Sequence, residues 1–331
     1  MKSFKISRSL ALRVLLSLIL VGFLLTKVDV QKVPELLAST KLHFFLFALA
    51  LAVVERMIFA FKWNMLLATK GLNIPFLRIL KIYYVSNFIG TFLPSSIGVD
   101  VFRAYSLNKQ NANPAESISS VLVDKVLSSI AALILPLAGV LLYFNVLAEQ
   151  DILVVIVATI AAFGVLLGIV VNRALIQKLL DRIKNVNHAL VGRIQDVYDA
   201  FSGYLAYKRV LIYVFGLSFG IQVIRALLMY LVGTSLDLDI SIVIYFTFVP
   251  IITLLTMLPI AVGGIGIREG AYVYFFSQAG VPTSDAFALS LLTYVLVMIS
   301  IIPGGIAYLL EGMSAKRGLA PVNDSRRRQS G

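Results

Sequence analysis

The sequence contains no cysteine, and its 331 residues include only two histidines and one tryptophan. Without cysteine the chain can build neither a disulfide framework nor a thiolate metal site. The histidines, His43 and His188, belong to no metal-binding spacing, and the sequence has no P-loop and no dinucleotide fingerprint. We therefore expect no metal and no cofactor, and neither ATP-driven transport nor nicotinamide chemistry is indicated.

Charged residues are scarce too, at 14%, whereas 59% of the residues are hydrophobic and the mean hydropathy is +0.92. A soluble domain has no interior large enough for this much apolar side chain. Several apolar runs reach the ~20 residues that a helix needs to cross about 30 Å of hydrocarbon. We predict an all-α polytopic membrane protein, built as a single integral membrane domain over residues 1–331.

The longest apolar runs predict about six spanning helices. They cover residues 10–28, 42–69, 116–144, 152–171, 210–233 and 284–310. The first run begins after Lys2, Lys5 and Arg8 and contains Arg13, and such a basic start could belong to a signal peptide. No small-residue cleavage pattern follows closely, which favours an uncleaved first span.

Two further apolar segments, residues 76–108 and 240–279, are interrupted near their middles by the sequences FLPSSIGVD and LPIAVGGIGIRE. The arms after the interruptions are too short to cross a membrane alone. Each segment is therefore predicted to be a re-entrant hairpin of two short helices, which leaves the membrane on the side where it entered.

The two broken segments belong to a predicted duplication. A shift of 168 residues places Gly98 on Gly266 and Pro114 on Pro282, and it superposes the neighbouring predicted spans in the same order. Chance matches between hydrophobic sequences are common, but an ordered series of helix, break and helix favours duplication. The predicted repeats cover about residues 42–146 and 210–311.

The net charge of +12 could suggest a nucleic-acid partner, but the basic residues lie in loops and tails beside the spans. This is the positive-inside pattern of membrane proteins, so no nucleic acid is expected. The N-terminus, residues 173–209 and the tail at about 314–331 are basic and belong in the cytoplasm. Both termini of this inner-membrane protein are then cytoplasmic, and the two repeats are inverted. Three lysines in the first external loop disagree mildly with this orientation.

Between the repeats, residues 174–207 form a predicted amphipathic helix. Apolar residues recur there at steps of three and four, with cations on the other faces. Such a helix can lie on the cytoplasmic interface, where its cations meet anionic lipid. A helix packed on the bundle, or a short coiled coil, explains the same pattern.

Inverted repeats with broken helices occur in secondary transporters, whose substrates bind where the two halves meet. An irregular backbone at that depth must be buried in protein or line a wet cavity. Glycine permits the turn and leaves N–H groups open to a ligand, and the helix that follows offers its positive N-terminal end to an anion. Close helix packing is the alternative role of these glycines. The predicted turn residues are Pro94, Gly98, Pro259, Gly263, Gly264 and Gly266.

Charged residues accompany both breaks and the centres of the predicted spans. Arginine at membrane depth costs roughly 2.5–3.5 kcal/mol on insertion scales, so each one needs a function or a partner. We predict a phosphate-binding site in which the charges hold or orient an anionic headgroup, with a purely structural network of ion pairs as the alternative. Lys62 and Trp63 are interpreted as interface anchors. The predicted site residues are Arg103, Arg268, Glu269, Asp100, Arg56, Arg225, Glu55, Asp124 and Lys125.

The sequences FLPSSIGVDVFRAYSL and LPIAVGGIGIREGAYVYFF resemble signatures of the lysylphosphatidylglycerol synthase transmembrane-region family. The likeness extends from about Leu10 to Leu310. The second signature matches closely, whereas in the first Val99 stands where a second glycine is expected. These are flippase-like proteins, which include the lipid-translocating half of the bacterial multiple peptide resistance factor. Bifunctional members carry a soluble aminoacyl-transfer domain after the membrane part, which this sequence lacks, so the resemblance implies no synthase activity. The matching residues are Pro94, Gly98, Asp100 and Arg103, then Pro259, Gly263, Gly264, Gly266, Arg268, Glu269 and Gly270.

The resemblance implies that the chain moves a membrane lipid with an anionic headgroup between leaflets. The lipid is an anionic or aminoacylated phospholipid, or a polyprenyl-phosphate glycolipid. Two alternatives stay open. One is a membrane-embedded enzyme that uses Asp100 or Glu269 as a base. The other is a non-catalytic partner of a lipid synthase or glycosyltransferase.

Overall fold

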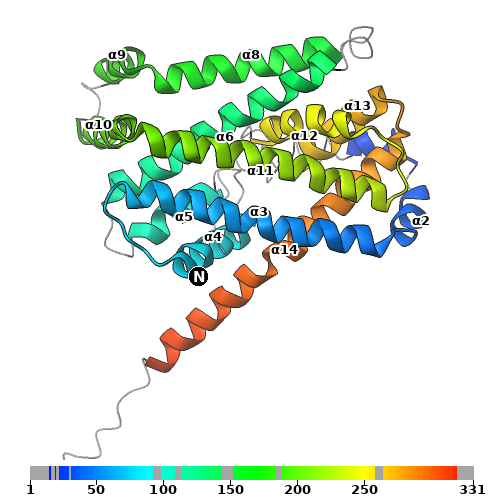
Figure 1. Ribbon diagram of the computed structural model, residues 1–331, viewed down its shortest axis with the longest axis horizontal. Helices are drawn as coiled ribbons and strands as arrows, with labels where there is room; N and C mark the ends of the chain where they lie inside the picture. The colour runs from blue at the N-terminus through cyan, green and yellow to red at the C-terminus, as the bar shows by residue number, and fades with distance from the viewer. Residues whose placement is uncertain are drawn as a thin grey trace, which may run out of the picture.

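The computed structural model describes residues 22–29, 31–91, 98–108, 113–142, 152–183, 188–257 and 264–318, with Leu15 and Ile19. Its described residues form helices and short connections, and no strand occurs among them. Most long helices lie side by side, and the C-terminal part of α14 extends away from the bundle (Figure 1). In chain order the helices are α2 (Lys32–Ala38), α3 (Leu42–Ala68), α4 (Phe76–Thr91), α5 (Gly98–Asn108), α6 (Pro114–Leu142), α8 (Ile152–Val171), α9 (Arg173–Ile183), α10 (His188–Ser202), the 3-10 helix η1 (Gly203–Ala206), α11 (Lys208–Ser235), α12 (Ile242–Met257), α13 (Ile267–Gln278) and α14 (Thr283–Gly318).

Five of the described helices are long and apolar enough to cross a membrane, namely α3, α6, α8, α11 and α14. On α8 the large side chains of Val154 and Val165 are exposed, as expected of a helix that faces lipid. The predicted all-α multi-pass class is thus confirmed. The first predicted span, residues 10–28, lies mainly outside the described residues.

Helices α3 and α11 pack side by side as an antiparallel pair (Figure 1). Contacts between these helices join residues whose numbers rise on one helix as they fall on the other. Helices that lie side by side can show this order only if they run in opposite directions. The contacts are Lys41 N to Ser235 O at 2.7 Å, Arg225 Nε to Glu55 Oε1 at 3.1 Å, and Lys62 Nζ to Ser218 Oγ at 2.9 Å.

The first helix of each predicted hairpin packs against the last spanning helix of the other predicted repeat. Helix α4 packs on α14, and its predicted counterpart α12 packs on α6, the counterpart of α14. Glycine allows close approach at both crossings: a Cβ at Gly304 would collide with the Tyr84 carbonyl, and one at Gly139 with the Thr247 side chain. A duplicated bundle predicts this exchange, although duplication and inversion themselves remain predictions.

The hairpin helices are short. Helices α4 and α12 have 16 residues each, α5 has 11 and α13 has 12. At 1.5 Å per residue none of them reaches ~30 Å, as a re-entrant hairpin requires. The predicted turn residues Pro94, Pro259 and Gly263 lie outside the described residues, so the shape of the turns stays a prediction.

Two turn glycines of the second hairpin have conformations that favour glycine. Gly264 has φ of 75° and Gly266 has φ of 87°, in the left-handed region where a side chain would be strained. Gly98, in contrast, is the first residue of α5 and is not among the positive-φ glycines. Only the second break therefore requires glycine for its backbone at the described positions.

The region predicted as one amphipathic helix over 174–207 contains α9, α10 and η1 instead. Arg173 Nη2 lies 3.4 Å from Asp199 Oδ1, and Tyr198 Oη donates to Val171 O at 3.0 Å. One straight helix would hold Arg173 and Asp199 about 39 Å apart, so the chain folds back on itself. Helix α10 packs on α6, which supports packing on the bundle for this part.

Candidate functional site

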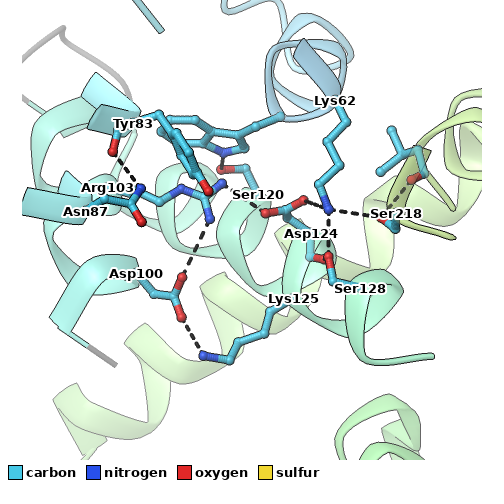
Figure 2. A network of polar contacts seen from close by, with 12 residues as sticks. Lys62, Tyr83, Asn87, Asp100, Arg103, Ser120, Asp124, Lys125, Ser128 and Ser218 are labelled. Atoms are coloured by element: carbon cyan, nitrogen blue, oxygen red, sulfur yellow. Dashed lines mark hydrogen bonds and ion pairs between the residues drawn. The ribbon is translucent and has the colours of Figure 1, made fainter. Parts of the chain in front are cut away.

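The buried charges of the bundle form two groups, of which the first joins α3, α5 and α6 (Figure 2). We call it the charge network: Lys62, Asp124, Arg103, Asp100 and Lys125. Cations and carboxylates alternate along it. Its links are Lys62 Nζ to Asp124 Oδ1 at 2.9 Å, Arg103 Nη2 to Asp124 Oδ2 at 3.0 Å, Arg103 Nη1 to Asp100 Oδ1 at 3.5 Å, and Lys125 Nζ to Asp100 Oδ2 at 2.5 Å.

Lys62 lies at the deep end of the charge network and is fully buried. Besides its ion pair with Asp124, its ammonium group donates to Ser128 Oγ at 2.6 Å and to Ser218 Oγ at 2.9 Å (Figure 2). One carboxylate and two hydroxyl groups thus surround the Lys62 ammonium group. The sequence-based interpretation of Lys62 as an interface anchor is therefore wrong, because α6 and α11 cover it and satisfy its charge.

Arg103 is enclosed by aromatic rings. Its guanidinium carbon lies 4.2 Å from the Trp63 ring centroid, 5.1 Å from that of Phe59 and 5.8 Å from that of Tyr83. Only 2% of Arg103 is exposed. Trp63 is itself fully buried and donates to Ser120 Oγ at 3.2 Å, so it is not an interface anchor either. Arg103 thus ties α5 to its neighbours and has little surface left for a ligand.

The second group of charges lines a cavity of about 260 Å³ at the centre of the bundle, which we call the central cavity. Its walls come from α3, α4, α11, α12, α13 and α14, and therefore from both predicted repeats. Its charged lining consists of three arginines and one glutamate. The polar lining residues are Glu55, Arg56, Tyr83, Asn87, Arg225, Thr253, Thr256, Arg268, Tyr272 and Thr293.

Two of the three cavity arginines are paired with carboxylates. Arg225 donates to Glu55 Oε1 through both Nε, at 3.1 Å, and Nη2, at 2.5 Å. Arg268 pairs with Glu269, and its guanidinium carbon lies 4.4 Å from the ring centroid of Tyr294.

The other oxygen of Glu269 accepts the backbone N–H of Gly266 at 2.6 Å. This contact caps α13 and uses one of the N-terminal amides that sequence reasoning assigned to an anion. In this hairpin the arginine side chain, and not that amide, is left to face a ligand.

Arg56 differs from the other two cavity arginines. It is 8% exposed, and its one hydrogen bond within the described residues runs from Nη1 to the Ala52 carbonyl at 3.0 Å. Its Nε is buried without an acceptor in the described protein, and so is Nε of Arg268. No carboxylate of the described residues forms an ion pair with Arg56. A guanidinium group is always charged and costly to bury alone, so the cavity contains an uncompensated positive charge.

The structure separates the predicted site residues. Helices from both repeats bring Glu55, Arg56, Arg225 and Arg268 together at the central cavity, with Glu269 behind Arg268. The remaining four predicted residues belong to the charge network, and Arg103 does not line the cavity beside Arg268. They are Asp100, Arg103, Asp124 and Lys125.

Sequence reasoning missed Lys62 in the network, and Tyr83, Asn87 and Tyr272 in the cavity. Asn87 and Tyr83 lie one turn apart on α4, where Asn87 Nδ2 donates to the Tyr83 carbonyl at 2.8 Å. Amide and hydroxyl groups on one face of a hairpin helix are a signal that could have pointed to this wall.

Comparison with known proteins agrees with this architecture. Over 299 residues the chain is 24% identical to a UPF0104 membrane protein of Methanothermobacter thermautotrophicus, with 84% of this chain and 88% of the relative covered. A UPF0104 membrane protein of Methanocaldococcus jannaschii is 25% identical over 310 residues, with 88% and 91% covered. The model of the lysylphosphatidylglycerol synthase TM region matches residues 10–306, and the chain belongs to this family of multi-pass membrane proteins.

Proposed function

We propose that the chain is a flippase-like lipid transporter, which holds the phosphate of a lipid headgroup in the central cavity while the acyl chains stay in the bilayer. The observation that carries this proposal is the meeting of three arginines at one cavity at the centre of the bundle. An intramembrane arginine is expensive, and one without a carboxylate partner calls for an anion.

The composition of the cavity walls supports transport over static binding. Helices of both predicted repeats contribute, and in secondary transporters the substrate binds at such a junction. Rocking one repeat against the other would open the cavity to each leaflet in turn. Arg56 and Arg268 would bind the phosphate, while Glu55 and Glu269 would hold Arg225 and Arg268 in place.

The lipid-modifying enzyme is the less favoured candidate, because both possible bases are engaged. Asp100 accepts from Lys125 and pairs with Arg103, and Glu269 accepts from Arg268 and from a backbone amide. A base must be free to take a proton from its substrate. Product formed by purified protein, and lost in Asp100→Asn, would favour the enzyme instead.

Reconstitution tests the proposed function. Purified protein is placed in liposomes that contain a fluorescent phospholipid labelled on an acyl chain, and dithionite quenching follows the exchange between leaflets. We expect exchange faster than in protein-free liposomes, and Arg56→Gln with Arg268→Gln should abolish the difference. Exchange no faster than in empty liposomes would count against a transporter.

A further inference from the structure

We infer that the central cavity selects an unmodified, singly charged phosphodiester headgroup and rejects an aminoacylated one. This inference rests on the proposed function and narrows its substrate. The family is named for a synthase of lysylphosphatidylglycerol, a lipid whose lysyl ester adds two positive charges at neutral pH to the single negative charge of its phosphate. The charges of this cavity favour the lipid without that ester.

The first argument is the charge around the cavity. Among the described residues, the guanidinium groups of Arg56, Arg225 and Arg268 face two carboxylates, those of Glu55 and Glu269, which leaves an excess of one positive charge. The segments that connect the hairpin helices, residues 92–97 and 258–263, contain no charged residue. One negative charge neutralises the site, whereas a headgroup with a net positive charge is repelled.

The second argument is that both carboxylates already pair with an arginine. One oxygen of Glu55 receives two donors from Arg225, and Glu269 binds Arg268 through one oxygen and the Gly266 amide through the other. A lysyl ammonium group would have to compete with an arginine for its carboxylate. An arginine that lost this competition would leave its guanidinium group without its ion-pair partner, which is costly.

The third argument is that unused donors suit a phosphate. Nε of Arg56 and Nε of Arg268 are buried without acceptors in the described protein. Both side chains line the cavity, where Asn87 and three threonines add polar groups of modest size. Charge-assisted hydrogen bonds from guanidinium to phosphate are among the stronger ones in proteins.

The size of the cavity agrees with a small headgroup. Its volume of about 260 Å³ lies just below the ~300–1,000 Å³ of pockets that hold drug-sized ligands. A phosphate with a short alcohol suits this space better than a diphosphate with attached sugars. A diphosphate diester also carries two negative charges against an excess of one positive charge.

Binding is measured first, because it does not depend on transport. Detergent-solubilised protein is titrated with phosphatidylglycerol and with lysylphosphatidylglycerol, and bound lipid is followed by native mass spectrometry. We expect phosphatidylglycerol to bind at least about tenfold more tightly. Arg56→Gln should remove this preference, whereas Arg173→Gln, the same change at an exposed arginine of α9 outside the central cavity, should keep it. Equal affinity, or preference for the lysyl lipid, overturns the inference whether or not the protein transports lipid.

Leaflet exchange in liposomes then separates the inference from the proposed function. Faster exchange of phosphatidylglycerol than of its lysyl ester supports both. Exchange of the lysyl ester at an equal or higher rate overturns the inference and leaves the transporter standing. Exchange of neither lipid removes the proposed function, and selective binding then describes a lipid-binding protein.

A gain-of-function variant adds a test that loss of folding cannot imitate. Thr253→Glu places a new carboxylate on the cavity wall contributed by α12 and cancels the excess positive charge. We expect it to weaken phosphatidylglycerol binding and to strengthen binding of the lysyl ester. Thr253→Gln has nearly the same shape without the charge and should change neither, so equal effects of the two variants would argue against charge selection.

Discussion

Arg225 of α11 donates two hydrogen bonds to one oxygen of Glu55 of α3, although 170 residues separate the two in sequence. The pair lies between two antiparallel helices that are predicted counterparts. Glu55 thereby fixes Arg225 at the edge of the central cavity, and Arg56, the next residue on α3, is left unpaired. Which arginine of the cavity carries the unpaired positive charge therefore depends on which one pairs with Glu55, the carboxylate that lines the cavity.

Glu55→Gln should lower stability, because Arg225 loses its partner in a half-buried position. Breaking a buried pair costs about 3–5 kcal/mol, and the partial exposure of this pair, 12% and 25% of the side chains, should reduce the loss to roughly 1–3 kcal/mol. Thermal unfolding in detergent measures it. Glu55→Gln with Arg225→Gln should cost less than the sum of the single changes, and strict additivity would show that the two side chains are not coupled.

The charge network allows a sharper test, because one of its ion pairs corresponds to an aromatic and an apolar residue in the second repeat. The shift of 168 residues places Lys62 on Tyr230 and Asp124 on Leu292. Lys62→Met alone leaves Asp124 with Arg103 as its remaining partner and should destabilise by about 3–5 kcal/mol. Lys62→Met with Asp124→Leu should recover part of the loss, because no buried carboxylate is left without its lysine.

Trp63, the one tryptophan of the chain, reports on this network directly. Its emission should shift to the red in Lys62→Met if the packing around Arg103 opens to water. The double variant should return the emission toward that of the unchanged protein. An unchanged spectrum in both variants, with full stability, would show that Lys62 does not support the site.

Close helix crossing should make Gly304 sensitive to substitution. A Cβ there would collide with the Tyr84 carbonyl on α4, and that carbonyl belongs to a helix backbone that cannot give way cheaply. Gly304→Ala should therefore destabilise by about 1–3 kcal/mol. Gly164→Ala on α8 is the matched control, because a Cβ there meets nothing within 4 Å and alanine favours the helix. Equal unfolding temperatures for the two variants would contradict the crossing.

The fold could be predicted from the sequence further than the site could. Spanning helices can be recognised in the sequence as apolar runs of ~20 residues, and the predicted span 152–171 coincides with α8. The partner of a buried charge depends instead on which helices meet. Nothing local to Lys62 indicates that Ser218 lies 2.9 Å away on an antiparallel helix. The fold-back of residues 174–207 was missed for the same reason, since the apolar period persists through both helices.

Sequence position also could not tell Arg103 from Arg268. Each lies on the short helix that follows a break, and each has a nearby acidic residue. The difference comes from the neighbouring helices. Helix α6 presents Asp124 to Arg103 and closes it off, whereas α14 presents the ring of Tyr294 to Arg268 and leaves it beside the cavity.

This difference predicts opposite consequences for two matched substitutions. Arg103→Gln removes a 2% exposed guanidinium group from an aromatic enclosure and leaves Asp124 with one partner fewer, so stability should fall by about 3–5 kcal/mol. Arg268→Gln removes a cavity cation that is 18% exposed and leaves Glu269 with the Gly266 amide, so stability should fall less than in Arg103→Gln while lipid binding falls at least about tenfold. Unfolding in detergent and native mass spectrometry with phosphatidylglycerol, run on both variants, measure the two effects. If the Arg103→Gln variant is as stable as the unchanged protein but no longer binds lipid, Arg103 belongs to the headgroup site, as the sequence analysis predicted.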